Sequence, residues 1–239
     1  MTRRTNARIA GFTFLFYIAA GIAAMILFGR AAGAEGTAAK LARIAEHATD
    51  MHVAILLTLF TCFMAIVLAV TLYAITRDQD PDLAMIALAC RFGEGILNAI
   101  FILTKLEVLW LATAAGGNAP DTAAANALGA FVLTAPRVWN TTITATFFAV
   151  GSTLFSWLLL RGRMIPAPMA WLGVVASALL VVGLPLQLAG AIRSPVTDVM
   201  WIPMLAFEVP LGLWLIVKGV ATPAPRRIPA ADGAGSQPS

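Results

Sequence analysis

The chain has 239 residues, of which 60% are hydrophobic and 12% charged, and its formal net charge is +4. A soluble domain carries roughly 25% charged residues, so most of this chain must face something other than water. The basic residues lie in short loops between apolar runs and not in one cluster, which argues against nucleic-acid binding and favours insertion in a membrane.

Six apolar runs are long enough to cross a bilayer, which takes about 20 residues per helix. In chain order they are Ile9–Phe28, Val53–Ile75, Leu83–Ala115, Val138–Leu160, Met169–Ala191 and Val199–Val217. Because the runs are continuous and do not alternate, they predict helices and not the strands of a membrane barrel. The expected fold class is all-α: an integral membrane bundle of six transmembrane helices, formed by residues 1–220.

Two loops and the C-terminal segment have patterns of their own. In the first outer loop, Thr37–His52, apolar residues such as Leu41 and Ile44 recur at helical spacing. This predicts an outer amphipathic helix lying on the membrane surface. The segment Thr122–Ala135 is apolar but too short to cross, which predicts an interfacial or re-entrant helix. Residues 221–239 are rich in Pro, Ala and Gly, which is typical of a disordered tail, here on the cytoplasmic side.

The placement of Lys and Arg predicts the orientation, because cytoplasmic loops carry an excess of both. With cytoplasmic termini, the inner side would carry Arg3, Arg4, Arg8, Arg77, Arg161, Arg163, Lys218, Arg226 and Arg227, and the outer side Arg30, Lys40, Arg43, Arg137 and Arg193. The inner set is the larger. The sequence therefore predicts that the N- and C-termini both lie in the cytoplasm.

The third span carries ionisable side chains that are rare inside membranes. It begins at Asp80-Pro81-Asp82, where a capping acid and a first-turn proline predict a helix start. From there Arg91, Glu94, Asn98 and Lys105 fall within an arc of roughly 60°, at about 100° per residue. Such a polar stripe is costly against lipid, so it should face the interior of the bundle.

The sixth span holds one acid, Glu208, at about the depth of Arg91. From the helical rise, Arg91 and Glu208 lie about 13 Å and about 15 Å inside the cytoplasmic ends of their helices. We expect these two side chains to be in contact, with Glu94 on the same face and Asn98 adding a hydrogen bond. The candidate site is thus an intramembrane charge layer of Arg91, Glu94, Asn98 and Glu208. Lys105, with Glu107 nearby, is interpreted as a snorkelling pair at the outer interface.

The charge layer has two interpretations. A structural ion pair would lock the third span against the sixth. A proton or substrate site would use the same groups, since ionisable residues inside membranes often mark such sites. The structural interpretation is favoured and predicts a sensing, scaffolding or accessory membrane module. The alternative is a proton or small-solute carrier.

Catalytic and metal-binding motifs are missing from the sequence. It contains no HExxH or GxSxG motif and no serine–histidine pair within the spans, so an intramembrane enzyme is the least favoured class. Both histidines, His47 and His52, lie in the first outer loop. Haem carriers place paired histidines within spans, so haem has no ligands here. Glu46 and Asp50 lie near the two histidines and would allow a metal site at the outer surface, but solvated charges on an amphipathic helix are the favoured interpretation. We therefore expect no cofactor and no metal. The expected partners are the lipid bilayer and a second copy of the chain or another membrane protein, and no nucleic acid.

Three segments of the chain carry motifs. The first is Arg91-Phe-Gly-Glu94; the second is Arg163-Met-Ile-Pro166 with Trp171-Leu-Gly173; the third is Pro203-Met-Leu-Ala-Phe-Glu208 with Trp214-Leu215 and Lys218-Gly219. In sequence and spacing they resemble a bacterial family of six-span membrane proteins called domain of unknown function 4386. The resemblance extends over nearly the whole chain up to Gly219. It implies a protein of the bacterial cytoplasmic membrane and implies no activity, because that family has none assigned.

Overall fold

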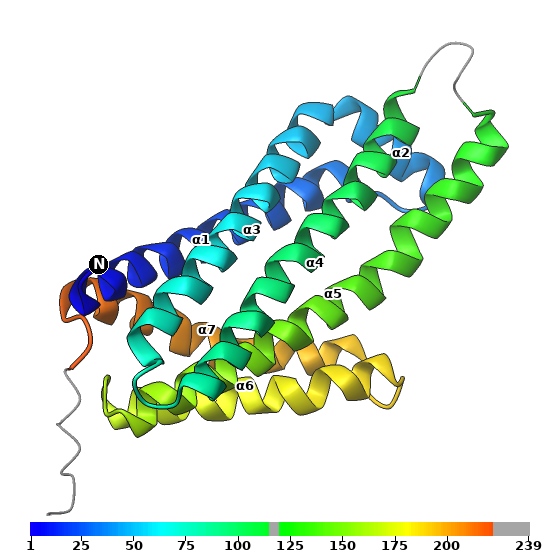
Figure 1. Cartoon of the computed structure of the whole chain (residues 1–239). Coiled ribbons are helices and arrows are strands. Elements are labelled where there is room, and N and C mark those ends of the chain that lie inside the picture. Colours follow the sequence, from blue (N-terminus) through cyan, green and yellow to red (C-terminus); the bar gives the residue numbers. More distant parts are fainter. Residues whose placement is uncertain (115–119, 222–239) are drawn as a thin grey trace, which may run out of the picture.

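The computed structural model describes residues 1–114 and 120–221, apart from the side chains of residues 134–141 and 194–195. Within this part of the chain, six helices are long and apolar enough to cross a membrane. The helices are α1 (Arg3–Ala32), the short α2 (Thr37–Glu46), α3 (Ala48–Thr76), α4 (Pro81–Thr113), α5 (Thr122–Arg161), α6 (Ala167–Leu188) and α7 (Ser194–Val217) (Figure 1). The predicted all-α membrane bundle is confirmed.

Capping side chains set where α4 and α5 begin. The Asp80 carboxylate accepts a hydrogen bond from the backbone N–H of Leu83 at 3.1 Å, and Pro81 is the first helical residue. Asp121 caps α5 in the same way, with the N–H of Ala124 at 2.7 Å. Each acid satisfies an N–H that has no partner inside the helix and lies at the positive end of the helix dipole. This confirms the predicted start of α4.

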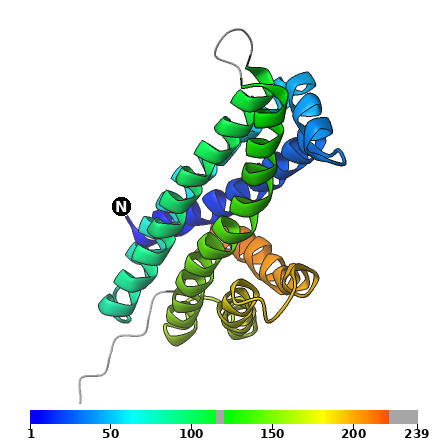
Figure 2. The ribbon, with the colours of Figure 1, turned by 90° about the vertical axis from the view of Figure 1, so that its right-hand side faces the viewer.

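The six long helices form a ring. Each packs against the next in the order α1, α3, α4, α5, α6 and α7, and α7 packs back against α1. Figures 1 and 2 show that α6 and α7 cover one end of the ring, whereas the far halves of α4 and α5 extend beyond them toward α2. The ring is therefore closed at the end that holds the N-terminus and more open toward α2.

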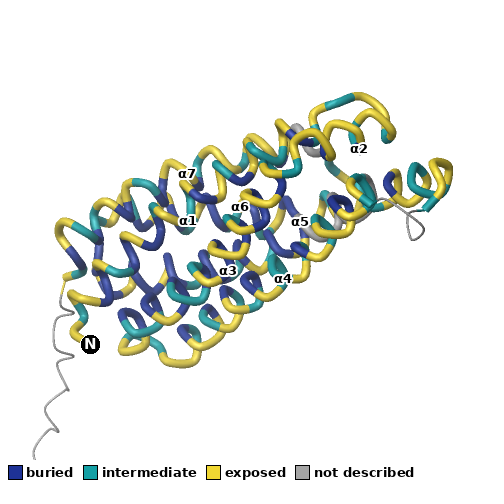
Figure 3. Tube along the Cα trace, turned by 90° about the horizontal axis from the view of Figure 1, so that it is seen from above, coloured by how far each residue is buried: buried dark blue, intermediate teal, exposed yellow. Residues whose placement is uncertain are grey.

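Buried residues line the inward faces of the helices, as Figure 3 shows in dark blue. They form two apolar clusters. The larger draws on α1 and α3 to α7 and includes Phe14, Leu72 and Phe148. The smaller surrounds α2 and includes Leu41 and Ile44. Large apolar side chains remain exposed on the outward faces, as expected where lipid is the solvent.

The short helix α2 differs from its prediction in length and in surroundings. It ends at Glu46, and His47, with φ −108° and ψ 33°, separates it from α3. The apolar side chains Leu41 and Ile44 are buried, and α2 packs against α1, α3, α4 and α5. The amphipathic helix is confirmed, and its apolar face is covered by other helices of the chain.

The separate helix predicted for Thr122–Ala135 was wrong. This segment is the first part of α5, a continuous helix of 40 residues. At about 1.5 Å per residue the helix is about 60 Å long, well beyond the hydrocarbon core. Gly129 explains part of the extension, because a Cβ there would lie 3.0 Å from Leu41 and 3.1 Å from Thr37 of α2. Contact with α2 thus supports the first turns of α5.

Polar contacts gather at the end of the bundle that holds the N-terminus. Arg3 forms an ion pair with Asp78 at 3.6 Å, and Arg161 forms one with Asp80 at 3.2 Å. At the same end, the backbone N–H of Ala221 donates to a carbonyl in the turn after α5. The start of α1 and the end of α7 therefore lie on the same side. The predicted tail lies outside the described residues beyond Ala221, as do the side chains of Arg137, Arg226 and Arg227 used in the orientation argument.

Candidate functional site

The centre of the site is an ion pair within α4. Nη1 of Arg91 lies 2.9 Å from Oε2 of Glu94, and the two side chains are 1% and 2% exposed. Residues three apart on a helix share a face, so this pairing follows from the local geometry of α4. An isolated charge at this depth would be expensive, and the pair offsets much of that cost.

Tyr17 ties the ion pair to α1. Its hydroxyl donates a hydrogen bond to Oε1 of Glu94 at 2.7 Å. Both oxygens of Glu94 therefore face a partner, one of them charged and one neutral. Because α1 and α4 are not neighbours in the ring, this bond crosses the interior of the bundle.

The guanidinium of Arg91 is also held by aromatic rings. Its Cζ lies 4.7 Å from the ring centroid of Phe148 on α5 and 5.8 Å from that of Tyr17. A cation against a ring in a desolvated site gains about 2 kcal/mol. The N–H groups of Arg91, however, are not aligned on any hydrogen-bond acceptor among the described residues. The Arg91 guanidinium is thus surrounded by aromatic rings of α1 and α5 and by a carboxylate of α4, and its N–H donors are not fully used.

Glu208 lines a small cavity together with Arg91 of this pair. The cavity has a volume of about 10 Å³, and its lining includes Arg91, Glu208, Ser152 and Ser156. That volume accommodates about one water molecule. Glu208 is 6% exposed and forms no hydrogen bond or ion pair with a described residue. The predicted ion pair between Arg91 and Glu208 is not present, because Arg91 pairs with Glu94 on its own helix.

The helices that carry these acids are not locked together as predicted. Among the described residues, α4 and α7 do not pack against each other and lie on different sides of the ring. Equal depth, which the sequence supplies, does not determine whether two helices are neighbours. The two groups that the sequence analysis places in contact line the same cavity but form no ion pair.

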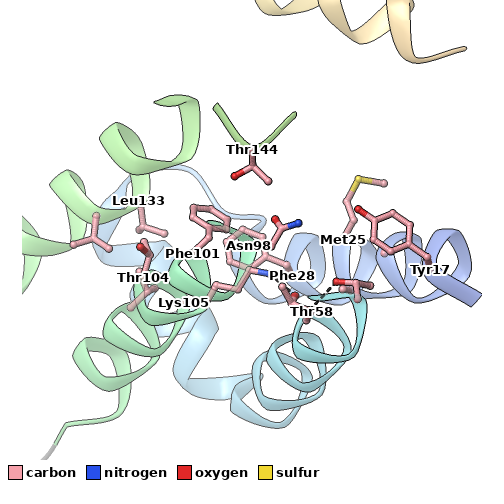
Figure 4. Close-up of a pocket in the computed structure, with 15 residues that line it drawn as sticks. Tyr17, Met25, Phe28, Thr58, Asn98, Phe101, Thr104, Lys105, Leu133 and Thr144 are labelled. Atoms are coloured by element: carbon pink, nitrogen blue, oxygen red, sulfur yellow. Dashed lines mark hydrogen bonds between the residues drawn. The ribbon is translucent and has the colours of Figure 1, made fainter. Parts of the chain in front are cut away.

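Asn98 and Lys105 line a larger pocket further along α4, toward α2. The pocket has a volume of about 400 Å³ and lies between α1, α3, α4 and α5. Figure 4 shows Tyr17 at one end and Thr104 and Leu133 at the other, with Asn98 and Lys105 between them. Tyr17 therefore belongs both to the pocket and to the ion pair.

The interpretation of Lys105 as half of a boundary pair with Glu107 was wrong. Its Nζ donates to Oγ1 of Thr58 on α3 at 2.7 Å, and it lies 5.9 Å and 5.8 Å from the ring centroids of Phe28 and Phe101. Residues two apart on a helix point about 200° from each other, which directs Glu107 away from the pocket. Lys105 faces inward, as do the other members of the polar stripe.

The histidines of the first loop show no metal geometry. His47 lies 3.9 Å from Asp50, and Nδ1 of His52 lies 2.8 Å from the carbonyl of Ala48. In the part of the chain that the structure describes, no three His, Cys, Asp or Glu side chains gather closely enough to hold a metal ion.

Tyr17 is the site residue that sequence reasoning missed. It lies in the middle of the first apolar run, where a hydroxyl needs a hydrogen-bond partner. That need was the available signal, but the sequence does not say which helix supplies the partner. The pocket was missed for the same reason, because four helices form it.

Fold and site together define a class of protein: a polytopic α-helical membrane protein whose spans enclose a buried ion pair beside a pocket. Residues 9–219 match the sequence family described as domain of unknown function (DUF4386). The chain belongs to this family, as its motifs indicate. Comparisons with curated proteins and with solved structures found no match.

Proposed function

We propose that the protein is a sensing module of the bacterial cytoplasmic membrane, with both termini in the cytoplasm. In this proposal a small molecule occupies the pocket, and its presence alters the packing of the charge layer. The observation that carries the proposal is the position of Tyr17, which lines the pocket and donates to Glu94. A ligand that displaces the Tyr17 ring would change the hydrogen bond to the buried ion pair, and with it the contact between α1 and α4.

The burial of the Arg91–Glu94 pair supports a sensing role over the transport of protons or small solutes. A carrier needs a polar route between its charged groups and both membrane surfaces. The side chains of Arg91 and Glu94 are 1% and 2% exposed, and the neighbouring cavity has a volume of only about 10 Å³. Carriage would require the ring to open at each transport cycle, against the packing of its larger apolar cluster.

The polar groups of the pocket support a binding role and not catalysis. The hydroxyl of Thr58 donates its proton to the carbonyl of Ala54 at 2.8 Å and accepts from Lys105 at 2.7 Å. Lys105 is therefore a donor in this pair and not a base that activates the hydroxyl. Partner proteins remain part of the proposal, because a sensor must pass its signal to a second copy or to another membrane protein.

A double-mutant cycle tests the link between pocket and layer. Gly21→Phe would place a ring at the exposed edge of the pocket, where a Cβ meets no atom within 4 Å, and Glu94→Gln would remove the charge while keeping an acceptor for Tyr17. We expect a coupling energy above about 0.5 kcal/mol in the unfolding free energy of the purified protein.

Gly29→Phe is the matched control, because Gly29 lies on the same helix, has equally open surroundings and does not line the pocket. Its cycle with Glu94→Gln should be additive. If the Gly21 cycle is additive too, the proposed link fails.

A transport assay distinguishes the sensor from the alternative, a proton carrier. In proteoliposomes loaded with a pH-sensitive dye, a carrier would produce a proton flux above that of empty liposomes, whereas a sensor would not.

A further inference from the structure

The larger pocket contains one charged side chain with no counter-ion. Of the lining residues whose side chains the structure describes, Lys105 is the only ionisable one apart from Tyr17. Among the described residues, Lys105 forms no ion pair with a carboxylate. Its neighbours are the neutral hydroxyl of Thr58 and the rings of Phe28 and Phe101. An ammonium group has three donors, so two remain for a ligand.

The walls of the pocket are suited to an alkyl chain. Most of the lining around Lys105 is apolar or aromatic, including Phe28, Phe101, Val108 and Leu133. The volume of about 400 Å³ lies within the range of ligand sites, about 300–1,000 Å³. A single hydrocarbon chain would be surrounded by side chains, while its polar head would be held at one point.

The pocket also has a lateral opening toward lipid. Gly21 and Met25 of α1 line it, and both are exposed, Met25 by 68%. They belong to the first apolar run, so this exposed edge lies at the depth of the hydrocarbon core. Gly21 leaves the entrance free of side-chain atoms, because nothing lies within 4 Å of the Cβ position there. A molecule dissolved in the bilayer could enter without passing through water.

We infer that this pocket binds a single-chain amphiphile with a carboxylate head, of the long-chain fatty acid class. The carboxylate pairs with Lys105 and accepts a further hydrogen bond from the side-chain amide of Asn98, and the chain leaves past Gly21 and Met25. The inference rests on the proposed sensing function and names its ligand. A monoanion matches the one cation among the described residues of the lining, whereas phosphate groups are more often held by several cationic or arginine donors.

Binding of radiolabelled palmitate to the full-length protein in nanodiscs tests the inference. We expect saturable binding that Lys105→Met weakens at least 10-fold, because this change removes the charge and keeps an unbranched side chain that is one atom shorter. Gly21→Phe should weaken binding similarly by blocking the entrance, and Gly29→Phe should leave it unchanged. If Lys105→Met fails to fold, the two glycine variants still decide whether palmitate occupies this pocket.

Competitors of equal chain length identify the head group. Unlabelled palmitate should compete, and hexadecanol and hexadecyl phosphate should compete at least 10-fold less well. Equal competition by hexadecanol would show that the charge of Lys105 plays no part, and stronger competition by hexadecyl phosphate would assign a phosphate ligand. Either result overturns the inference, as does the absence of saturable palmitate binding.

The two proposals can fail separately. Loss of the coupling between Gly21 and Glu94, with palmitate binding that depends on Lys105, would retain the ligand and refute the sensing mechanism. Coupling without palmitate binding would retain the mechanism and refute the ligand class.

Discussion

Two basic side chains on α4 have opposite surroundings. Arg91 lies in the closed part of the ring with a carboxylate 2.9 Å away. Lys105, about 21 Å further along the helix, has a hydroxyl and two aromatic rings as neighbours and, in the described part of the chain, no carboxylate. Both are cations on the same face of one membrane helix. The difference is that Arg91 has a carboxylate partner on its own helix, whereas Lys105 has none among the described residues.

The same contrast runs along α1. A Cβ at Gly11 would lie 2.5 Å from the carbonyl of Gly212 on α7, whereas a Cβ at Gly21 would meet nothing within 4 Å. Where α1 crosses α7 the helices are too close for a side chain, and beyond that crossing α1 lines the pocket. Small residues that permit close helix approach are typical of membrane helix interfaces.

The largest expected effect comes from breaking the closed ion pair. Glu94→Ala should lower the unfolding free energy by about 3–5 kcal/mol, because it leaves Arg91 buried without its counter-ion. Replacing both Arg91 and Glu94 with Leu should recover most of that loss. Denaturant titration in mixed micelles measures both, with the lipid-facing Phe92→Ala, exposed by 44%, as the control. A loss no larger than that of Phe92→Ala would contradict the structural role of the pair.

Substitutions in the two halves of α1 should change the unfolding free energy by smaller amounts and with opposite signs. Gly11→Ala should cost about 1–3 kcal/mol, since α1 and α7 must move apart to admit the methyl group. Gly21→Ala should stabilise the helix by up to about 1 kcal/mol, because alanine is the better helix former and the space is free. Thermal unfolding of the two variants beside the wild type measures the difference. Equal effects of the same sign would mean that the two halves are packed alike.

The smallest expected effect concerns the residue shared by pocket and layer. Tyr17→Phe removes one hydrogen bond inside the membrane and should cost about 1–2 kcal/mol. Tyr73→Phe is the matched control, because the Tyr73 hydroxyl makes no hydrogen bond to a described residue. The same unfolding titration applies to both. A cost for Tyr17→Phe no greater than that of its control would remove the link on which the sensing proposal rests.

The sequence by itself determined the features that depend on local order along the chain. Hydropathy and helix length located the six spans, Asp80 and Pro81 located the start of α4, and the helical period placed Arg91, Glu94, Asn98 and Lys105 on one stripe. These predictions succeed because a membrane helix satisfies its backbone internally and its side-chain directions follow from the helical repeat. Depth in the membrane can be calculated in the same way.

Only the tertiary structure decided which groups at one depth touch each other. Glu208 lies near the level of Arg91, yet the ring order places α7 beside α1 and α6 and not beside α4. Tyr17 became the second partner of Glu94, and four helices enclosed Lys105 in a pocket. The hydropathy pattern indicates where a residue lies along the membrane normal, but it does not indicate which helices are neighbours in the ring. Those neighbours are set by the side-chain packing between helices far apart in the chain.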